Sequence, residues 1–118
     1  MTTEIGKELR KLRIDEDERL LDMSQRLERS SAFISAVERG TKNPPSGFEE
    51  LVIKIYQLAG DAADTMRRAA DRSRKAFTIE ADSPLARDTA GLMARRMDSL
   101  SDDELKSIFQ ILNKKDAK

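Results

Sequence analysis

The chain has 118 residues and a mass of 13.3 kDa; 37% of the residues are charged, 38% hydrophobic and 4% aromatic. With a mean hydropathy of −0.63, this composition is typical of a helix-rich globular protein with a modest core. Because there is no cysteine and no histidine, disulfides, thiolate metal sites, and catalysis by a thiol or an imidazole are excluded.

The net charge is zero, from 22 basic and 22 acidic residues. Residues 1–60 carry ten basic and eleven acidic residues, and residues 61–118 carry twelve and eleven. A nucleic-acid-binding surface must therefore be a local basic patch. No apolar run approaches the roughly 18 residues that cross a bilayer, and the first twenty residues lack the apolar stretch of a signal peptide. We expect a cytoplasmic protein with no membrane partner.

The first part of the chain has apolar residues at helical spacing, which predicts five short helices. They are expected over residues 4–14, after the acidic run 15–18, from Ser30 to Gly40, from a capping box at Ser46, and from Asp61 to about Ser73. Ser30 is a favourable N-cap, and Gly40 suits a left-handed C-terminal cap. No strand pattern interrupts these helices.

The rest of the chain has a different pattern. Residues 76–81 alternate between apolar and polar and form the only plausible strand, whose partner must come from another chain. Ser83-Pro84 starts a helix to about Ser99, in which Gly91 indicates a close helix–helix approach. A capping box at Ser101 opens the last helix. We expect residues 75–118 to be a dimerisation extension that uses Phe77, Ile79, Leu85, Leu92, Met93, Leu105, Ile108 and Phe109.

Residues 22–40 predict a helix, a short turn and a second helix. The small Ser24 lies where the two helices are expected to cross, and Ile34 and Val37 pack against the first helix and the core. The opposite face of the second helix, with Ser31, Ala32, Ser35 and Ala36, is left without a partner inside the protein. A short helix held in this way fits the major groove of DNA, which is about 12 Å wide.

Residues 4–58 resemble the phage repressor/Cro-like helix-turn-helix domain, also called the xenobiotic-response-element type of bacterial regulator. The resemblance rests on the segment 5–13, on the stretch 22–40 just described, and on Asn43-Pro44. Its most specific part is the run ISAVERG at residues 34–40, which is close to the family's I-S-x-I-E-x-G ending. It implies an all-α fold with a lambda-repressor-like domain, which we place at residues 1–74.

The resemblance implies a homodimer that binds a double-stranded operator of two inverted half-sites, usually as a repressor. It makes Ser31, Ala32 and Ala36 the base-facing positions, with Phe33 and Ser35 at the margin. None of these is Arg, Gln or Asn. We therefore expect a larger share of the specificity to come from DNA shape and from Arg29, Arg39, Lys42 and Asn43. The expected DNA-binding residues are Arg26, Arg29, Ser30, Ser31, Ala32, Phe33, Ser35, Ala36, Arg39, Lys42 and Asn43.

Several simpler interpretations remain open at this point. The Ser/Ala face could be a solvated surface or a tight helix contact, and the basic residues could be ordinary surface charges. A second basic run at 67–75 either lies on a solvated helix face or contacts flanking phosphates. The alternative function is an antitoxin-like or phage-derived regulator whose C-terminal helices bind a second protein. An enzyme is disfavoured because no nucleophile–base pair is evident, and we expect no metal and no cofactor.

Overall fold

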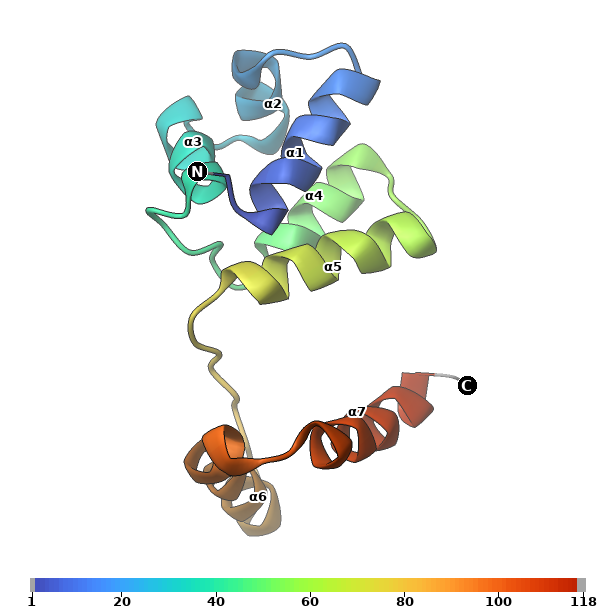
Figure 1. The fold of residues 1–118 in the computed structure, drawn as a ribbon. Helices are drawn as coiled ribbons and strands as arrows, with labels where there is room; N and C mark the ends of the chain where they lie inside the picture. Colours follow the sequence, from blue (N-terminus) through green and yellow to red (C-terminus); the bar gives the residue numbers. More distant parts are fainter. Residues whose placement is uncertain (1, 117–118) are drawn as a thin grey trace. The chain divides into compact units, whose positions relative to one another are not determined.

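The computed structural model describes residues 2–116, with only the backbone for residues 115 and 116. Every regular element in this range is helical, so the all-α fold class is confirmed (Figure 1). The helices are α1 (Glu4–Asp15), α2 (Leu20–Leu27), α3 (Ser31–Arg39), α4 (Phe48–Tyr56), α5 (Asp61–Ser73), α6 (Pro84–Arg96), a 3-10 helix η1 (Met97–Ser99), and α7 (Asp102–Asp116). The chain divides into two compact units between Phe77 and Thr78.

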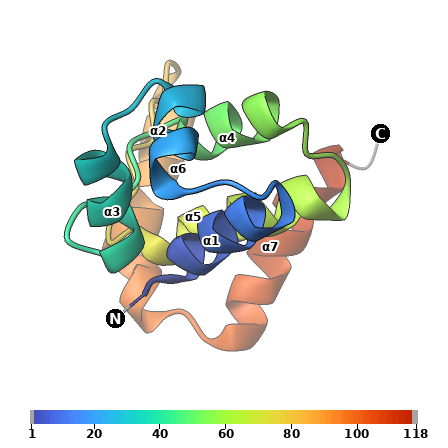
Figure 2. The same ribbon diagram turned by 90° about the horizontal axis from the view of Figure 1, so that it is seen from above.

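The first unit packs five helices around one core. Helix α1 lies against both α3 and α5, α2 lies against α3 and α4, and α4 also contacts α5 (Figures 1 and 2). The core is made of the buried residues Ile5, Leu9, Met23, Leu27, Ile34, Val37, Phe48, Val52, Tyr56, Met66, Ala69 and Ala70. Ile34 and Val37 are among them, as the sequence predicts for the second helix of the helix-turn-helix segment.

Helix ends in this unit follow the sequence signals in part. The Oγ of Ser30 accepts a hydrogen bond from the backbone N–H of Phe33 at 3.0 Å, and Gly40 caps the other end of α3 at φ +83°. The capping box expected at Ser46 is wrong, because α4 begins after Gly47, which lies at φ +85°. The backbone N–H of Phe48 instead donates to the carbonyl of Pro45 at 3.0 Å, so a tight turn enters this helix.

Close contact between the start of α1 and the end of α3 requires a glycine. A Cβ added to Gly6 would lie 2.5 Å from the carbonyl oxygen of Glu38 and 2.9 Å from its Cα. Thr3 caps α1 through the N–H of Gly6 at 3.1 Å, and its own N–H donates to the carbonyl of Glu38 at 2.9 Å. These contacts attach α3 to α1 at a fixed position.

The second unit consists of α6, η1 and α7, and no residue between 78 and 114 is buried. Its caps agree with the sequence signals: Ser83 Oγ accepts from the N–H of Ala86 at 3.0 Å, and Ser101 and Glu104 form the reciprocal capping box. The strand expected at residues 76–81 is not confirmed. Within residues 2–116 there is no second strand for that segment to pair with, and it has no regular secondary structure.

Crossing a bilayer takes a helix of roughly 18 or more predominantly apolar residues. Among residues 2–116, no helix combines the necessary length with the necessary apolar character. The longest, α7, has 15 residues.

Candidate nucleic-acid interface

Helix α3 lies at the edge of the first unit (Figures 1 and 2), and its buried residues lie on one side of it. Ile34 and Val37 are fully buried, and Glu38 is 4% exposed. On the other side Ala32 and Arg39 are exposed. The other predicted contact residues on this helix are half-buried, namely Ser31, Phe33, Ser35 and Ala36. The fold of residues 2–77 therefore fixes the inner face of this helix and leaves an outer strip of small side chains accessible.

The turn between α2 and α3 is closed by short-range hydrogen bonds. Ser24 is buried where the two helices meet, as the sequence predicts, and its hydroxyl donates to the carbonyl of Arg29. Glu28 ends α2 in the left-handed conformation at φ +54°. The guanidinium of Arg29 donates to the carbonyl of Glu28 at 3.1 Å. Arg29 is thus held at the turn, where its exposed side chain flanks the start of α3.

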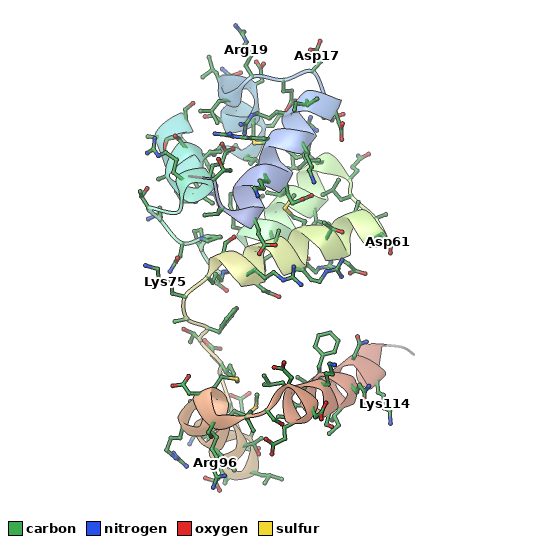
Figure 3. The ribbon with its side chains drawn as sticks, in the orientation of Figure 1. Asp17, Arg19, Asp61, Lys75, Arg96 and Lys114 are labelled. Carbon is green, nitrogen blue, oxygen red and sulfur yellow. The ribbon has the colours of Figure 1, made fainter. Side chains whose placement is uncertain are left out.

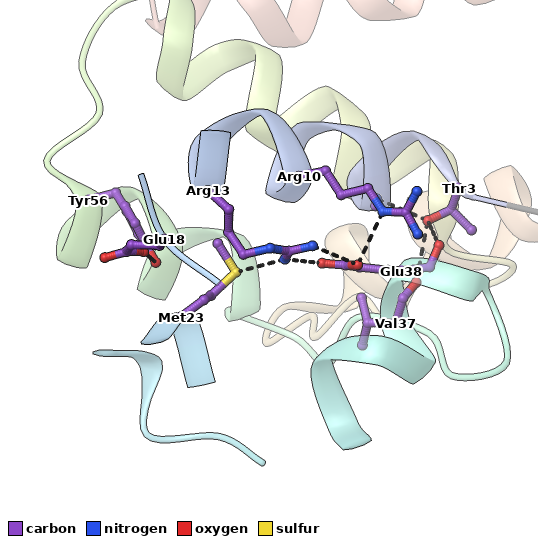
Figure 4. Close-up of polar contacts among 9 residues, drawn as sticks. Thr3, Arg10, Arg13, Glu18, Met23, Val37, Glu38 and Tyr56 are labelled. Carbon is purple, nitrogen blue, oxygen red and sulfur yellow. Dashed lines mark hydrogen bonds and ion pairs between the residues drawn. The ribbon is translucent and has the colours of Figure 1, made fainter. Parts of the chain in front are cut away.

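A buried ion pair attaches the end of α3 to α1 (Figure 4). The guanidinium of Arg13 contacts both carboxylate oxygens of Glu38, with Nη2 lying 3.2 Å from Oε1. These side chains are 12% and 5% exposed. Arg10 lies 3.6 Å from the same carboxylate but is 54% exposed. This arrangement was not predicted from the sequence, where its local sign is two arginines three residues apart on one face of α1.

Arg26, which was expected at the DNA-facing surface, is engaged elsewhere. Its guanidinium lies 2.9 Å from a carboxylate oxygen of Glu16, 2.8 Å from one of Glu18, and 4.0 Å from the centre of the Tyr56 ring. Hydrogen bonds to Glu18 and then to Glu16 raise the pKa of Arg26. It also donates to the carbonyl of Ile55 at 3.2 Å. Arg26 therefore joins α2 to α4 and to the loop after α1, and we leave it out of the proposed interface.

The other predicted cations remain beside α3. Arg39 is exposed in the last turn of α3. The backbone N–H of Lys42 donates to the carbonyl of Ala36 at 3.2 Å, and its ammonium lies 5.7 Å from the ring centre of Phe33. Phe33 packs edge-to-face on Phe48 at 5.6 Å, so part of its ring belongs to the core. Asn43 follows in the same exposed loop.

The second basic run is largely engaged in ion pairs. Arg74 donates to the carbonyls of Pro44 at 2.9 Å and Pro45 at 2.7 Å, and it pairs with Glu49. Burial would raise the pKa of Glu49, but hydrogen bonds from Arg74 and the backbone outweigh it and lower that pKa. Lys75, just after α5, is exposed (Figure 3). The sequence places Arg74 in a basic run on a solvated helix face or against flanking phosphates, whereas in the structure it fixes the loop that follows Lys42 and Asn43.

Comparisons with known proteins add no relative. The chain gives no significant match to protein-family models, to curated proteins or to solved structures. Among the side chains of residues 2–114, no three acidic groups lie close enough together to hold a metal ion. The surface of α3 is therefore interpreted from its own geometry and charge.

Proposed function

We propose that this chain is a sequence-specific, double-stranded DNA-binding transcriptional regulator of the repressor/Cro-like helix-turn-helix type. In this proposal it acts as a homodimer on an inverted-repeat operator and represses transcription there. One observation carries the proposal: Ile34, Val37 and Glu38 fix the inner side of α3, whereas its outer side presents small residues. A helix with these properties can lie in a major groove about 12 Å wide.

The side chains on the outer strip decide how bases would be read. Ser31, Ala32 and Ala36 are small, so the backbone of α3 can come close to the base edges. Two alanines favour contact with thymine methyl groups, and a serine hydroxyl can donate to or accept from several bases. None of these residues offers the bidentate hydrogen bonds of Arg, Gln or Asn. We therefore expect DNA shape and the flanking residues Arg29 and Asn43 to contribute much of the specificity.

The charges around α3 supply the basic patch that a chain of zero net charge requires. Arg29 flanks the start of the helix, Arg39 is in its last turn, and Lys42 is held beside it by the carbonyl of Ala36. Cations in such positions contact phosphates and set the orientation of the helix on the duplex. Their number is small, so non-specific affinity is expected to be modest.

The second unit favours a protein partner in addition to DNA. Large apolar side chains are exposed in this unit, namely Ile79, Leu85, Leu92, Met97, Phe109, Ile111 and Leu112, and so is Phe77, the last residue of the first unit. A homodimer would cover such residues and would bring two copies of α3 to two half-sites. Pairing of residues 76–81 with the same segment of a second copy stays a prediction. A regulator whose C-terminal helices bind a different protein is the second function that this exposure favours.

Arg39→Ala tests the assignment of the basic patch. On random-sequence duplex DNA, the variant should bind all sequences more weakly, and the slope of log affinity against log salt should fall by about one per protomer. The measurement is a fluorescence-anisotropy titration at several salt concentrations.

Arg26→Ala is the matched control because it removes the same charge from the ion pairs with Glu16 and Glu18. It should lower the melting temperature but leave the salt slope unchanged. Equal slopes for Arg39→Ala and the wild type would contradict the proposal. So would a fall in slope of the same size for Arg26→Ala.

A further inference from the structure

No residue of α6 is buried, and one side of this helix combines exposed leucines with two opposite charges. Leu85 is 76% exposed and Leu92 is 51% exposed, and the two residues lie two helical turns apart. Asp88 and Arg95 are also exposed, and neither forms an ion pair with any other described side chain. Because residues seven apart return to the same side after two turns, Asp88 and Arg95 share a face of this helix.

Gly91 lies between these two charges, in the interior of a helix that it weakens. Among the residues that the structure describes, a Cβ added at Gly91 would meet only the guanidinium of Arg95, at 3.4 Å. Its φ is not in the left-handed region, so no turn requires a glycine here. By contrast, the glycine at position 6 fits a close backbone contact inside the protein. No backbone conformation and no close contact among the described residues therefore requires a glycine at position 91.

We infer that α6 pairs antiparallel with α6 of a second copy, around a two-fold axis that passes between Gly91 and Leu92. In this arrangement Leu92 of each copy packs over Gly91 of the other. Asp88 of each copy lies opposite Arg95 of the other, which forms two equivalent ion pairs. Both relations share the same midpoint along the helix, as an isologous contact requires.

The arrangement of charges on this face of α6 indicates that its binding partner is a second copy of the chain. The face carries an acid and a base at equal distances from its centre, so it complements itself only when the two helices run in opposite directions. A parallel pair would set Asp88 against Asp88 and Arg95 against Arg95. Antiparallel helices also align their dipoles favourably. The inference supplies a contact for the proposed homodimer, and it rests on the proposed function only for the role of that dimer on DNA.

Gly91→Leu in the 118-residue chain distinguishes an α6 that pairs with a second copy from an α6 that is exposed to solvent. In the paired helix the larger side chain should raise the dimer dissociation constant by about tenfold or more. In a solvated helix, Leu has the higher helix propensity and should only strengthen α6. The measurement is sedimentation velocity without DNA over a range of protein concentrations. Ala94→Leu, an exposed position on a different side of α6, is the control and should leave the dissociation constant unchanged.

Charge reversal gives a second measurement on the same interface. Asp88→Arg alone places arginines against each other and should raise the dissociation constant by about tenfold at low salt. Asp88→Arg combined with Arg95→Asp should restore the wild-type value. A wild-type chain that stays monomeric at micromolar concentration would overturn the inference. A dimer that is indifferent to both Gly91→Leu and Asp88→Arg would overturn it as well. Because dimerisation is measured without DNA, a failure to dimerise through α6 is distinguishable from a failure to bind DNA.

Discussion

Ala32→Glu is expected to reduce the affinity for a specific duplex by at least about 100-fold, because like charges brought together at an interface cost several kcal/mol. Ala32 is exposed on the outer strip of α3, so the new carboxylate would face phosphates and base acceptors. The fold should be unaffected, since an acidic side chain in the first turn of a helix interacts favourably with the positive end of the dipole. The affinity is measured by fluorescence anisotropy and the folding by circular dichroism.

Ala62→Glu provides a control of matched chemistry. Ala62 is the second residue of α5, as Ala32 is of α3, and both are exposed. The two substitutions therefore change the net charge and the first turn of a helix in the same way. If both variants lost affinity equally, the effect would be one of overall charge. If Ala32→Glu bound as well as the wild type, the outer side of α3 would not face DNA.

Arg13→Ala should lower the free energy of unfolding of the first unit by about 3 kcal/mol. The guanidinium is the bidentate partner of Glu38, whose side chain is 5% exposed. Without it, a buried carboxylate is left with only the more distant Arg10, at 3.6 Å. The loss should be measured by urea denaturation followed by circular dichroism.

Arg10→Ala is the companion variant, since this arginine faces the same carboxylate from a largely exposed position. Arg10→Ala should lower the free energy of unfolding by less than about 1 kcal/mol, because exposed ion pairs contribute little to stability. Replacing Arg13 and Glu38 together by methionine should recover much of the stability that Arg13→Ala loses, because no buried charge then remains unpaired. Equal losses for Arg10→Ala and Arg13→Ala would mean that burial does not determine the strength of this contact.

The sequence predicted the features that depend on near neighbours in the chain. The cap at Ser30, the left-handed Gly40 and the buried Ser24 all involve bonds or packing between residues a few positions apart or on one helical stripe. The reciprocal bonds of Ser101 and Glu104 belong to the same class. Such patterns are readable because helix geometry alone brings these groups together.

The sequence did not predict contacts that depend on how the helices pack. Arg26 was counted with the DNA-facing cations because nothing local ties it to Glu18, eight residues earlier. The Arg13–Glu38 pair joins residues that are 25 positions apart, and Arg74 reaches Pro44 across 30 positions. An arginine that is free at the surface and one that is held in ion pairs look the same in the sequence. Only the tertiary fold distinguishes the two.

Selection of bound duplexes from a random DNA library tests the central claim most directly. The 118-residue chain should enrich a two-fold symmetric consensus whose half-sites lie about one helical turn, roughly 34 Å, apart. The Ala32→Glu variant should enrich nothing under the same conditions. Failure of the wild-type chain to enrich any sequence over the starting library would contradict the account, and so would recovery of the same consensus by Ala32→Glu.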